Sequence, residues 1–581
     1  MNALIRIADL LEDGARRWPH HLAYADARRE VAYAQLAYAV RRASVALREH
    51  GVTRGERVAV YAPKQYETVV SLLAINAIGA IFVPVNPQLK EAQVLHILRD
   101  SGATLFITGM QRLKRMSEVH DVMGAGGVLL TEALAEVVHV RLGAVPDLPG
   151  ASTDSACADV TLAGLTAVDD DPAAILYTSG STGAPKGVVL TQRNLVSGAQ
   201  SVAAYQRLHS SDVILGVLPL SFDAGLSQLT TALVAGACYA PLDFMQASEV
   251  PRYCEARNVT SITGVPPLWM QLASVTWSDT SRSRIRRFAN TGGHLATPLL
   301  ERLQSLYVNA EPYLMYGLTE AFRSTWLAPE DVKTRPASIG KAVPNAEVLV
   351  LRADGSVCDV DEPGELVHRG AFVTLGYWNQ PQLTAQRFRP LPNVHRQIPR
   401  PGVAVWSGDI VRRDAEGYLY FVARGDDMIK TSGYRVSPTE VEDVLFGRPH
   451  VREAAVFGVP HPALGQAIVA CVVSSLDEDS CRTDIVRICR EALPTYMAPL
   501  VIDVQASLPR NPNGKIDRPA LKALHADAFA ETAGVIAAAD HANGAASRIE
   551  PPAPSQAERS AAPQTTPQTE ANTEETVACP T

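Results

Sequence analysis

The sequence predicts an α/β protein in which a large N-terminal domain with mainly parallel sheets precedes a small α+β C-terminal domain on a hinge. From about residue 20 to 420, short β-rich runs alternate with longer amphipathic stretches, as in parallel sheets crossed by helices. Near residue 424 the sequence pattern changes, and this change marks the start of a compact unit of about 100 residues. Since 581 residues exceed what one hydrophobic core supports, two or more domains are expected.

The apolar runs locate the elements of the large domain. Strands are expected at 55–63, 80–86, 104–109 and 173–176. A helix is expected at 91–100, between the strands at 80–86 and 104–109. The most hydrophobic run, 69–85, contains Asn76, Gly79 and Pro84, so we interpret it as a buried helix followed by a strand and not as a membrane span.

The small domain begins with a signal for the start of a helix. Ser437, Pro438 and Glu440 supply a cap, a proline at the first helical position and an acid at the third, which together form a capping box. Further along this domain we expect strands at 454–459 and 467–475 and a helix at 482–493.

The predicted domains are a large one at 1–425, a small one at 426–524 and a tail at 525–581. The end of the chain is rich in Pro, Ala, Thr, Gln and Glu, with almost no large apolar residues. Such a segment cannot bury a core, so we expect the tail to be disordered.

Composition and charge exclude several classes of protein. The net charge is −8 and basic residues are not clustered, so no nucleic-acid partner is expected. Eight cysteines are scattered without the CxxC spacing of metal sites, which indicates a reduced, cytoplasmic setting rather than a disulfide framework. Asp9, Glu12 and Asp13 interrupt the first apolar stretch, so it is not a secretory signal. We also expect no transmembrane segment.

The strongest chemical signal is the loop YTSGSTGAPKG, which starts at Tyr177. Its glycines let the backbone close around an anion with N–H groups pointing inward, and its hydroxyls add donors. A lysine near its end adds positive charge, although the spacing is not that of a Walker A loop. The predicted phosphate-binding residues are Thr178, Ser179, Gly180, Ser181, Thr182, Gly183 and Lys186.

This loop resembles the signature loop of the adenylate-forming superfamily, which includes acyl-CoA synthetases, adenylation domains of peptide synthetases and beetle luciferase. Further motifs follow in order, so that the resemblance covers roughly residues 20–522. In particular, the chain resembles bacterial stand-alone AMP-forming acyl-CoA ligases. The resemblance implies an AMP-binding domain and a mobile C-terminal domain that together convert a small-molecule carboxylic acid into an acyl-adenylate and then a thioester. ATP, Mg²⁺ and coenzyme A, or the phosphopantetheine of a carrier protein, are the implied cofactors.

The motif YGLTE supplies part of the implied nucleotide site. A hydroxyl can bond a phosphate, a carboxylate can hold Mg²⁺ and an aromatic ring can stack on a base. The resemblance assigns Tyr316, with the neighbouring Gly317, to the adenine, Thr319 to the α-phosphate and Glu320 to magnesium, and it makes the last two catalytic residues.

Three other segments complete the implied nucleotide site. Gly292 and Gly293, in NTGGHLAT, are similar to the glycine pair beside the adenine. Asp409 follows Ser407, where the superfamily usually has Thr, and one carboxylate can accept hydrogen bonds from both ribose hydroxyls. Arg424 is expected to contact the ribose or a phosphate.

The remaining motifs concern the movement of the small domain. The resemblance makes Asp426 the hinge about which this domain rotates between the two half-reactions. It places Lys430 and Gly433 at the active site during thioester formation. Lys515, after a tight Asn-Gly turn, is the strongest catalytic candidate, because an ammonium between the attacking carboxylate and the α-phosphate stabilises developing charge.

Phe222 and Asp223 align with a segment that lines the acyl pocket, and they leave the acid open. Amino-acid-activating relatives carry Phe followed by an Asp that holds the substrate ammonium. The surrounding LPLSFDAGLSQL instead resembles stand-alone acyl-CoA ligases. A third interpretation is that Asp223 caps the helix that follows it.

The thiol acceptor is also open at this point. No carrier-protein module follows residue 522, so the acceptor is either coenzyme A or a separate carrier protein in trans. An acyl-CoA ligase is the leading hypothesis, and an amino-acid-activating enzyme that loads a carrier protein is the alternative. An oxidative, luciferase-like enzyme and a non-enzymatic scaffold are more remote, and the presence of Lys515, Glu320 and Asp409 counts against the scaffold.

Overall fold

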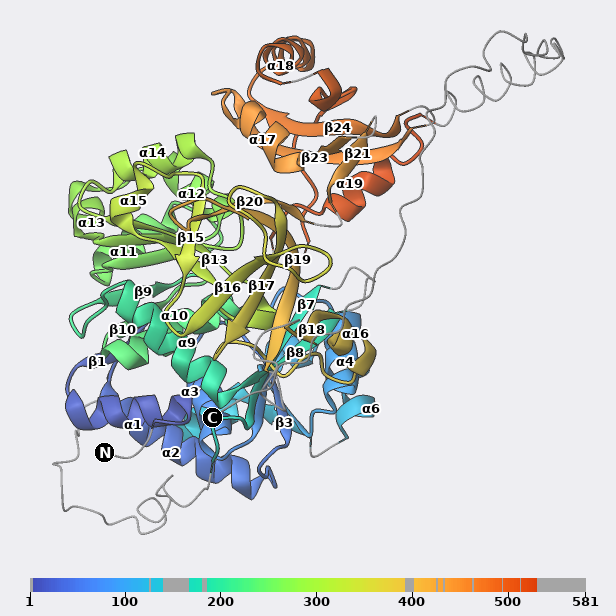
Figure 1. The fold of residues 1–581 in the computed structure, drawn as a ribbon. Helices are drawn as coiled ribbons and strands as arrows, with labels where there is room; N and C mark the ends of the chain where they lie inside the picture. The colour runs from blue at the N-terminus through green and yellow to red at the C-terminus, as the bar shows by residue number, and fades with distance from the viewer. Residues whose placement is uncertain are drawn as a thin grey trace, which may run out of the picture. The chain divides into compact units, whose positions relative to one another are not determined.

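The fold was obtained as a computed structural model (Figure 1). The structure describes residues 4–124, 127–138, 167–179, 185–391, 402–424, 427–431, 434–461, 464–493, 495–511 and 514–529. Met1–Asp527 form one compact unit, within which we call residues 4–424 the large lobe and 427–527 the small lobe. Nearly all of the expected tail, from residue 530 onward, lies outside the described residues.

The large lobe contains a sheet that is six-stranded within the described residues, with the order β6-β5-β3-β4-β7-β8. Every neighbouring pair is parallel except β7 and β8, which are antiparallel. Every strand predicted in the large domain belongs to this sheet, and so do the two strands that flank the phosphate loop. The strands are β3 (Arg57–Tyr61), β4 (Ile81–Pro84), β5 (Leu105–Thr108), β6 (Val128–Leu130), β7 (Pro172–Ser179) and β8 (Pro185–Thr191).

A second sheet of the large lobe has 14 strands among the residues that the structure covers. One half is mainly parallel and consists of β1 (Leu22–Ala25), β2 (Glu30–Ala32), β9 (Val213–Gly216), β10 (Cys238–Pro241), β11 (Ser261–Gly264), β12 (Arg287–Asn290) and β13 (Glu311–Tyr316). The other half is antiparallel, which the sequence did not lead us to expect, and consists of β14 (Thr325–Leu327), β15 (Ser338–Ala342), β16 (Ala346–Leu351), β17 (Gly364–Gly370), β18 (Phe388–Pro390), β19 (Val403–Arg413) and β20 (Leu419–Arg424).

Helices pack against both sheets of the large lobe (Figure 1). They are α1 (Ile7–Arg17), α2 (Tyr33–Glu49), α3 (Tyr66–Ala77), α4 (Glu91–Ser101), α5 (Met110–Leu113), α6 (Val119–Met123), α7 (Thr131–Val138), α9 (Gln192–Tyr205), α10 (Asp223–Ala235), α11 (Glu249–Ala256), α12 (Pro266–Ser274), α13 (Asp279–Arg284), α14 (Thr297–Leu306), α15 (Pro329–Val332) and α16 (Pro381–Arg387), with the 3₁₀ turn η2 (Thr319–Ala321). Helix α4 confirms the helix predicted at 91–100.

The hydrophobic run at 69–85 forms a buried helix and a strand, as predicted. Every residue of α3 is buried, the turn at Gly79 has a positive φ of 76°, and β4 follows directly. Helix α3 packs against α1 and α2, and its Tyr66 contacts the ring of Tyr24 on β1 at 5.4 Å. One hydrophobic core therefore joins the two sheets of the large lobe.

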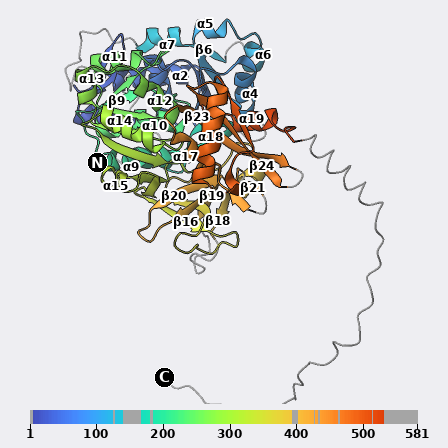
Figure 2. The ribbon, with the colours of Figure 1, turned by 90° about the horizontal axis from the view of Figure 1, so that it is seen from above.

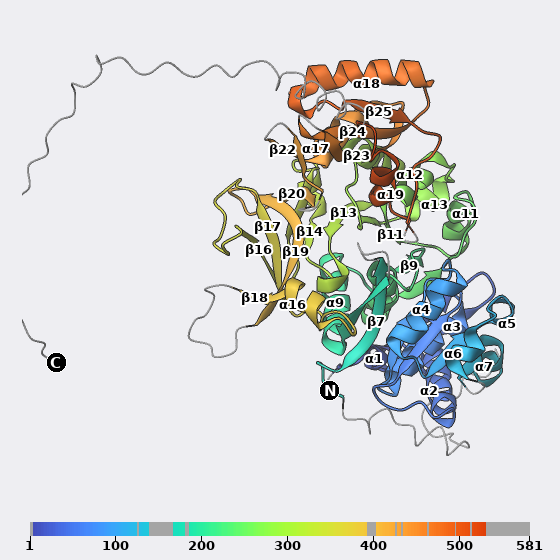
Figure 3. The same ribbon diagram turned by 90° about the vertical axis from the view of Figure 1, so that its right-hand side faces the viewer.

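The small lobe is built on a separate sheet, five-stranded in the part of the chain described, with the order β22-β21-β24-β23 and β25 beside β24. Helix α18 lies along the outside of this sheet (Figures 2 and 3). Its elements are β21 (Ile429–Thr431), β22 (Tyr434–Val436), α17 (Pro438–Phe446), β23 (Val451–His461), β24 (Gly465–Ser474), α18 (Glu478–Ala492), η3 (Thr495–Met497), β25 (Val501–Val504) and α19 (Arg518–Leu524).

The helix start predicted for the small domain is confirmed. The Ser437 hydroxyl accepts a hydrogen bond from the backbone N–H of Glu440 at 3.4 Å, and Pro438 occupies the first turn. The predicted strands and helix correspond to β23, β24 and α18. The chain leaves the large sheet at Arg424 and enters the small one at Ile429, so the boundary at 425/426 remains our prediction for the domains.

None of the helices in the described parts of the chain is long and apolar enough to cross a membrane. The six cysteines that the structure describes are free and buried. Cys157 and Cys579 lie outside the described residues.

Candidate active site

The ends of β7 and β8 frame the predicted phosphate loop. Thr178 and Lys186 stand opposite each other in this antiparallel pair. The Thr178 hydroxyl is buried and finds no hydrogen-bond partner among the described residues. A buried hydroxyl without a partner is costly, and a phosphate oxygen would satisfy it. The loop's own Gly180, Ser181, Thr182 and Gly183 lie outside the described residues, and of Ser179 only the backbone is described.

Lys186 and Glu320 meet across the site, and Tyr377 joins them. The Lys186 ammonium is 3.3 Å from Glu320 Oε1 and donates a hydrogen bond of 2.9 Å to the Tyr377 hydroxyl. That hydroxyl in turn donates to Glu320 Oε1 at 2.6 Å, and Lys186 lies 4.1 Å above the Tyr377 ring. Tyr377 belongs to none of the motifs that predicted the site, and it lies near β8 through its bridge to Val188.

The charge state of this group suits a cation-binding carboxylate. Burial tends to raise the pKa of Glu320, but Lys186 and the Tyr377 hydroxyl hold it below its usual value. Glu320 is therefore ionised at neutral pH. Burial lowers the pKa of Lys186, although Glu320 opposes that effect. Thr319 precedes Glu320 on the 3₁₀ turn η2 and is half-buried.

A second polar group lies where β13, β19 and β20 end or bend. The Tyr316 hydroxyl donates to Asp409 Oδ2 at 2.5 Å, and Arg424 Nε donates to Asp409 Oδ1 at 3.1 Å. Asp409 is buried, and the Ser407 hydroxyl accepts its backbone N–H at 3.0 Å. The Asp409 carboxylate raises the pKa of Arg424. Each carboxylate oxygen accepts more than one hydrogen bond, so Asp409 keeps acceptor capacity for ribose hydroxyls.

Lys515 of the small lobe reaches the same site. Its turn is closed by hydrogen bonds between Asn511 and the Lys515 backbone, and Gly514 has a φ of 76°. Gly292 also has a positive φ, 73°, and a Cβ built on it would lie 3.9 Å from Lys515 Cε, so the missing side chain leaves room there. Gly293 is the exposed next residue.

The ammonium of Lys515 is surrounded by charges. Lys515 is an exposed residue. The surrounding protein and the positive charge of Arg424 nevertheless lower the pKa of its ammonium, whereas the carboxylates of Asp223, Asp409 and Glu320 act to raise that pKa. The structure therefore brings together Lys515, Glu320, Asp409 and Arg424, which lie far apart in the sequence.

Asp223 is paired with an arginine that the sequence analysis did not single out. Arg323 Nη1 donates to Asp223 Oδ2 at 3.1 Å, and the Arg323 side chain is 5% exposed. Asp223 is the first residue of α10, and its Oδ1 accepts the backbone N–H of Ala224. Phe222 occupies the cap position, without a side-chain cap. The helix-cap hypothesis is therefore incomplete, because Asp223 also carries the counter-charge of Arg323.

The conformation of Phe322 places Arg323. Phe322 has φ 50° and ψ −51°, a region that a bulky residue rarely adopts, and it is fully buried. A Cβ built on Gly198 would lie only 2.4 Å from the Phe322 ring, so the absence of a side chain at Gly198 makes space for it. The strained residue turns the chain at the end of η2, two residues after Glu320, and directs Arg323 toward α10.

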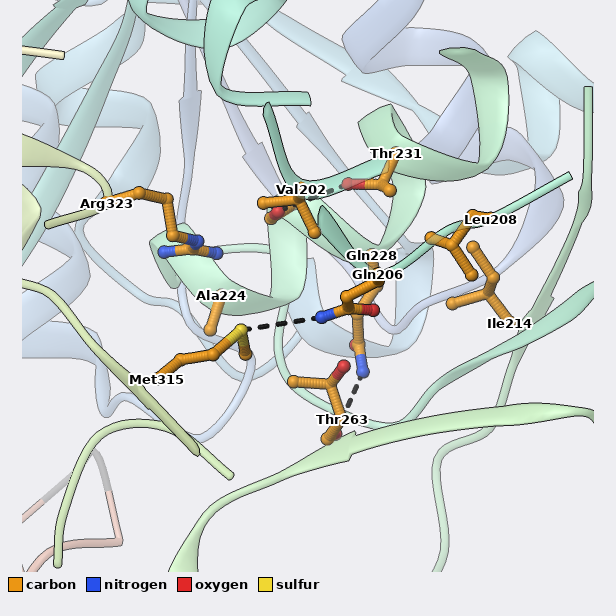
Figure 4. Close-up of a pocket in the computed structure, with 11 residues that line it drawn as sticks. Val202, Gln206, Leu208, Ile214, Ala224, Gln228, Thr231, Thr263, Met315 and Arg323 are labelled. Carbon is orange, nitrogen blue, oxygen red and sulfur yellow. Dashed lines mark hydrogen bonds between the residues drawn. The ribbon is translucent and has the colours of Figure 1, made fainter. Parts of the chain in front are cut away.

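Arg323 lines a small cavity behind the site (Figure 4). Its volume is about 20 Å³, room for about one water molecule. The amide of Gln228 donates to the Thr263 carbonyl at 3.0 Å, and that of Gln206 to Met315 Sδ at 3.4 Å. Val202, Gln206, Leu208, Ile214, Ala224, Ser227, Gln228, Thr231, Thr263, Met315 and Arg323 line it. The cavity beside Arg323 and Ala224 is thus small, with both apolar and amide-bearing side chains in its wall.

The Asp223→Ala substitution should destabilise the protein. It removes the counter-charge from a guanidinium that is 5% exposed, and we expect a loss of about 1–3 kcal/mol in the free energy of unfolding, measured by denaturant titration. The double variant Asp223→Ala/Arg323→Met should recover part of this loss, because no charge is then stranded. Asp279→Ala, at a side chain that is 90% exposed, is the matched control. Unchanged stability with selective loss of amino-acid use would instead mean that Asp223 holds a substrate ammonium.

Two predicted residues of the moving segment cannot be placed. Asp426, the predicted hinge, and Gly433 lie outside the described residues. Lys430 lies on β21, where only its backbone is described. Their roles remain predictions.

Two residues missed in the sequence had usable signals. Arg323 is the third residue after Glu320, and it is a charged residue two positions before the first residue of the strand β14. Tyr377 lies in a run, LGYWNQP, that combines aromatic and turn residues close to the end of a strand-rich stretch. Neither signal in the sequence indicates which distant residue the side chain contacts.

Comparison with known proteins identifies the family of the chain. The profile of the family described as AMP-binding enzyme matches residues 11–378, and that of the AMP-binding enzyme C-terminal domain matches 440–515. The chain is 32% identical over 513 residues to 2-succinylbenzoate–CoA ligase of Geobacillus kaustophilus (strain HTA426), covering 87% of this chain and 95% of that protein. The o-succinylbenzoate CoA synthetase (MenE) from Bacillus subtilis, solved with the acyl-adenylate intermediate OSB-AMP, has a TM-score of 0.73 and 26% identity, covering 88% of this chain and 97% of that one.

Peptide synthetases also match. Syringomycin synthase SyrB1 of Pseudomonas syringae pv. syringae is 30% identical over 526 residues, covering 88% of this chain and 80% of that protein. Gramicidin S synthase 2 of Brevibacillus brevis is 27% identical over 519 residues, but the chain spans only 11% of its length. Since a family profile covers more than half of the sequence and the ligase relative matches nearly end to end, the chain belongs to the AMP-binding enzyme family and is an ATP-dependent, AMP-forming acid–thiol ligase of the acyl-CoA synthetase type.

Proposed function

We propose that this protein is an acyl-CoA ligase that adenylates a carboxylic acid with ATP and transfers the acyl group to coenzyme A. The observation that carries the choice of acid is the ion pair between Asp223 and Arg323. An enzyme that activates amino acids through this aspartate needs its carboxylate for the substrate ammonium. Here the carboxylate already neutralises a buried guanidinium, so the amino-acid alternative has no free counter-charge at that position.

In the proposed first step, a substrate carboxylate oxygen attacks the α-phosphorus of ATP and pyrophosphate leaves. Lys515 neutralises charge on both reacting groups, and Thr178, Thr319 and Lys186 bond phosphate oxygens. The ionised carboxylate of Glu320 fits the hard-ligand preference of Mg²⁺ and would hold the ion, which would supply charge neutralisation at the phosphates.

The nucleotide is positioned by the second polar group. Asp409 accepts the ribose hydroxyls, and the hydrogen bond from Tyr316 and the contact with Arg424 fix the direction of its carboxylate. The Tyr316 ring and Gly292 flank the adenine. These groups align the α-phosphate with the incoming carboxylate, which lowers the barrier by orientation.

In the proposed second step, the small domain rotates about Asp426, removes Lys515 from the site and brings Lys430 and Gly433 toward it. The thiol sulfur then attacks the acyl carbon, and AMP leaves. Glycine at position 433 gives the pantetheine arm room to enter.

The acid is proposed to be short. A cavity beside Arg323 and Ala224, next to the Asp223–Arg323 ion pair, has a volume of only about 20 Å³, and the amides of Gln206 and Gln228 line it, so it offers no room for a long alkyl chain. A compact acid, aromatic or with a further polar group, suits these walls better.

A carrier protein is the second candidate for the acceptor. The relatives among peptide synthetases favour it, because SyrB1 matches most of this chain. The adenylation chemistry is the same in both cases, and the two candidates differ only in the thiol.

Pyrophosphate exchange across a panel of short aromatic, short aliphatic, long-chain fatty and amino acids tests the proposal. We expect exchange with short non-amino acids at rates at least about tenfold above those with amino acids and long-chain acids. Mass spectrometry of the product with coenzyme A should then show the acyl-CoA. Exchange confined to amino acids, or an acyl-adenylate that coenzyme A leaves intact, would contradict the proposal and favour the carrier protein.

A further inference from the structure

Three side chains with metal-ligating atoms converge in the small lobe, away from the adenylation site. Cys471 is on β24, Asp503 on the neighbouring strand β25, and His525 directly follows α19. Cys471 Sγ is 3.8 Å from Asp503 Oδ2 and 4.0 Å from His525 Nε2, and His525 Nε2 is 3.1 Å from the same Asp503 oxygen. Three different elements thus present one thiol, one carboxylate and one imidazole to a common point.

The imidazole of His525 is oriented as a ligand. Its Nδ1 faces the carbonyl oxygen of Leu521 at 2.9 Å, so the Nδ1–H donates there and the lone pair of Nε2 faces the cluster. Histidines that bind metals have this arrangement, in which the second nitrogen donates to a carbonyl. The ring also makes an edge contact with Phe457 at 5.7 Å, which fixes its plane.

The carboxylate of Asp503 is held in a fixed position beside the imidazole. Its Oδ2 lies 3.1 Å from His525 Nε2, and with protons on both ring nitrogens His525 forms an ion pair with it. Asp503 Oδ2 also accepts from the amide of Gln505 at 2.6 Å, which holds the carboxylate in place. A metal ion bound by Nε2, the carboxylate and the sulfur would take the place of the Nε2 proton.

The distances match tetrahedral zinc. Zinc bonds of about 2.3 Å to sulfur and 2.0–2.2 Å to nitrogen or oxygen, at tetrahedral angles, place the ligand atoms about 3.3–3.6 Å apart. The observed separations of 3.1, 3.8 and 4.0 Å approach these values, and shifts of about 0.5 Å would complete the match. We propose that Cys471, Asp503 and His525 bind one Zn²⁺ ion, with a water molecule as the fourth ligand.

The bound ion would fasten α19 to the sheet of the small lobe. Helix α19 begins at Arg518, three residues after Lys515. The Asp517 side chain caps it by accepting the N–H of Ala520 at 3.1 Å. The ligand His525 lies at the opposite end of the same helix. The metal would thus tie the base of the turn that carries Lys515 to β24 and β25. His525 falls within the segment that we expected to be a disordered tail, and its contacts extend the ordered lobe beyond residue 524.

Binding would exchange a proton for the metal. Cys471 is buried among the other two side chains of the cluster. On binding, the sulfur–zinc bond forms and the thiol proton passes to solvent.

Zinc content and cobalt spectra of the full chain test the site, without ATP or Mg²⁺. Wild-type protein equilibrated with Zn²⁺ and freed of excess metal should retain one ion per chain by elemental analysis. With Co²⁺ it should show the absorption band of a thiolate bound to cobalt. Cys471→Ser should abolish this band, and Cys471→Ser, Asp503→Asn and His525→Gln should each weaken zinc binding at least about 10–100-fold.

Two matched controls come from the same lobe. His450→Gln alters a second His–Asp pair, 2.8 Å from Asp484 but without a cysteine, and Cys489→Ser alters another buried thiol. Both should keep the ion, the cobalt band and a zinc-dependent rise in Tm. Wild-type protein that retains no more zinc than Cys471→Ser would overturn the proposal, as would a cobalt band that survives in Cys471→Ser but disappears in Cys489→Ser. Tm measured in chelator checks that each variant is folded.

Discussion

Replacing Lys515 by alanine is expected to lower the rate of adenylation, measured by pyrophosphate exchange, by about 10²–10³-fold. Asp223, Asp409, Glu320 and Arg424 all act on the charge of Lys515, and its Cε lies close to Gly292, so we expect its ammonium to stand where the reacting carboxylate and phosphate meet. Thioester formation from supplied acyl-adenylate should be largely spared, because the proposed rotation carries Lys515 away before the thiol attacks.

The control for this prediction is Lys114→Ala, which removes the same charge from an exposed position. It should leave both half-reactions unchanged. An equal loss in the two half-reactions of Lys515→Ala would contradict the two-conformation account of the small domain. An unchanged pyrophosphate exchange would remove Lys515 from the catalytic group.

Glu320→Gln is expected to have an effect of similar size, about 10²–10³-fold on adenylation. An amide is a weaker ligand for Mg²⁺ than a carboxylate, so the magnesium concentration for half-maximal exchange should rise. The substitution also leaves the Lys186 ammonium, with a side chain only 17% exposed, without its counter-charge at 3.3 Å, and Tm should fall.

Magnesium titration of pyrophosphate exchange, paired with thermal unfolding, separates the two effects of Glu320→Gln. The matched control is Glu330→Gln, at a side chain that is 61% exposed and paired with Arg207. A variant at Glu320 with a wild-type magnesium response would show that this carboxylate is not the metal ligand. Lower stability without loss of exchange would leave it a purely structural role.

Local features of the structure could be predicted from the sequence. The strands β3, β4 and β5 and the capped start of α17 follow from apolar runs and from Ser437, because period and capping act within a few residues. The antiparallel half of the second sheet was missed. Short strands separated by loops give no local sign of whether their neighbours run parallel or antiparallel.

The candidate site, too, could be predicted from the sequence only in part. Motifs located Lys186, Glu320 and Asp409, but they did not show that Tyr377 completes the first group, because that contact spans 57 residues from Glu320. Arg323 meets Asp223 across 100 residues, and the positive φ of Phe322 is needed to direct it there. Sequence patterns record which face of an element is apolar, whereas long-range pairing depends on how the completed sheets are arranged.

Helix α3 has a consequence for how the large lobe loses its structure. All of its residues are buried, and its amide-bearing Asn76 joins the start of α1, through the N–H of Ala8, to Gln192 at the start of α9. Neither sheet can separate from the other without exposing this helix on all sides. We therefore expect the two sheets to unfold together, so a split of the large lobe into two co-expressed fragments should leave α3 and both of its neighbours on one piece.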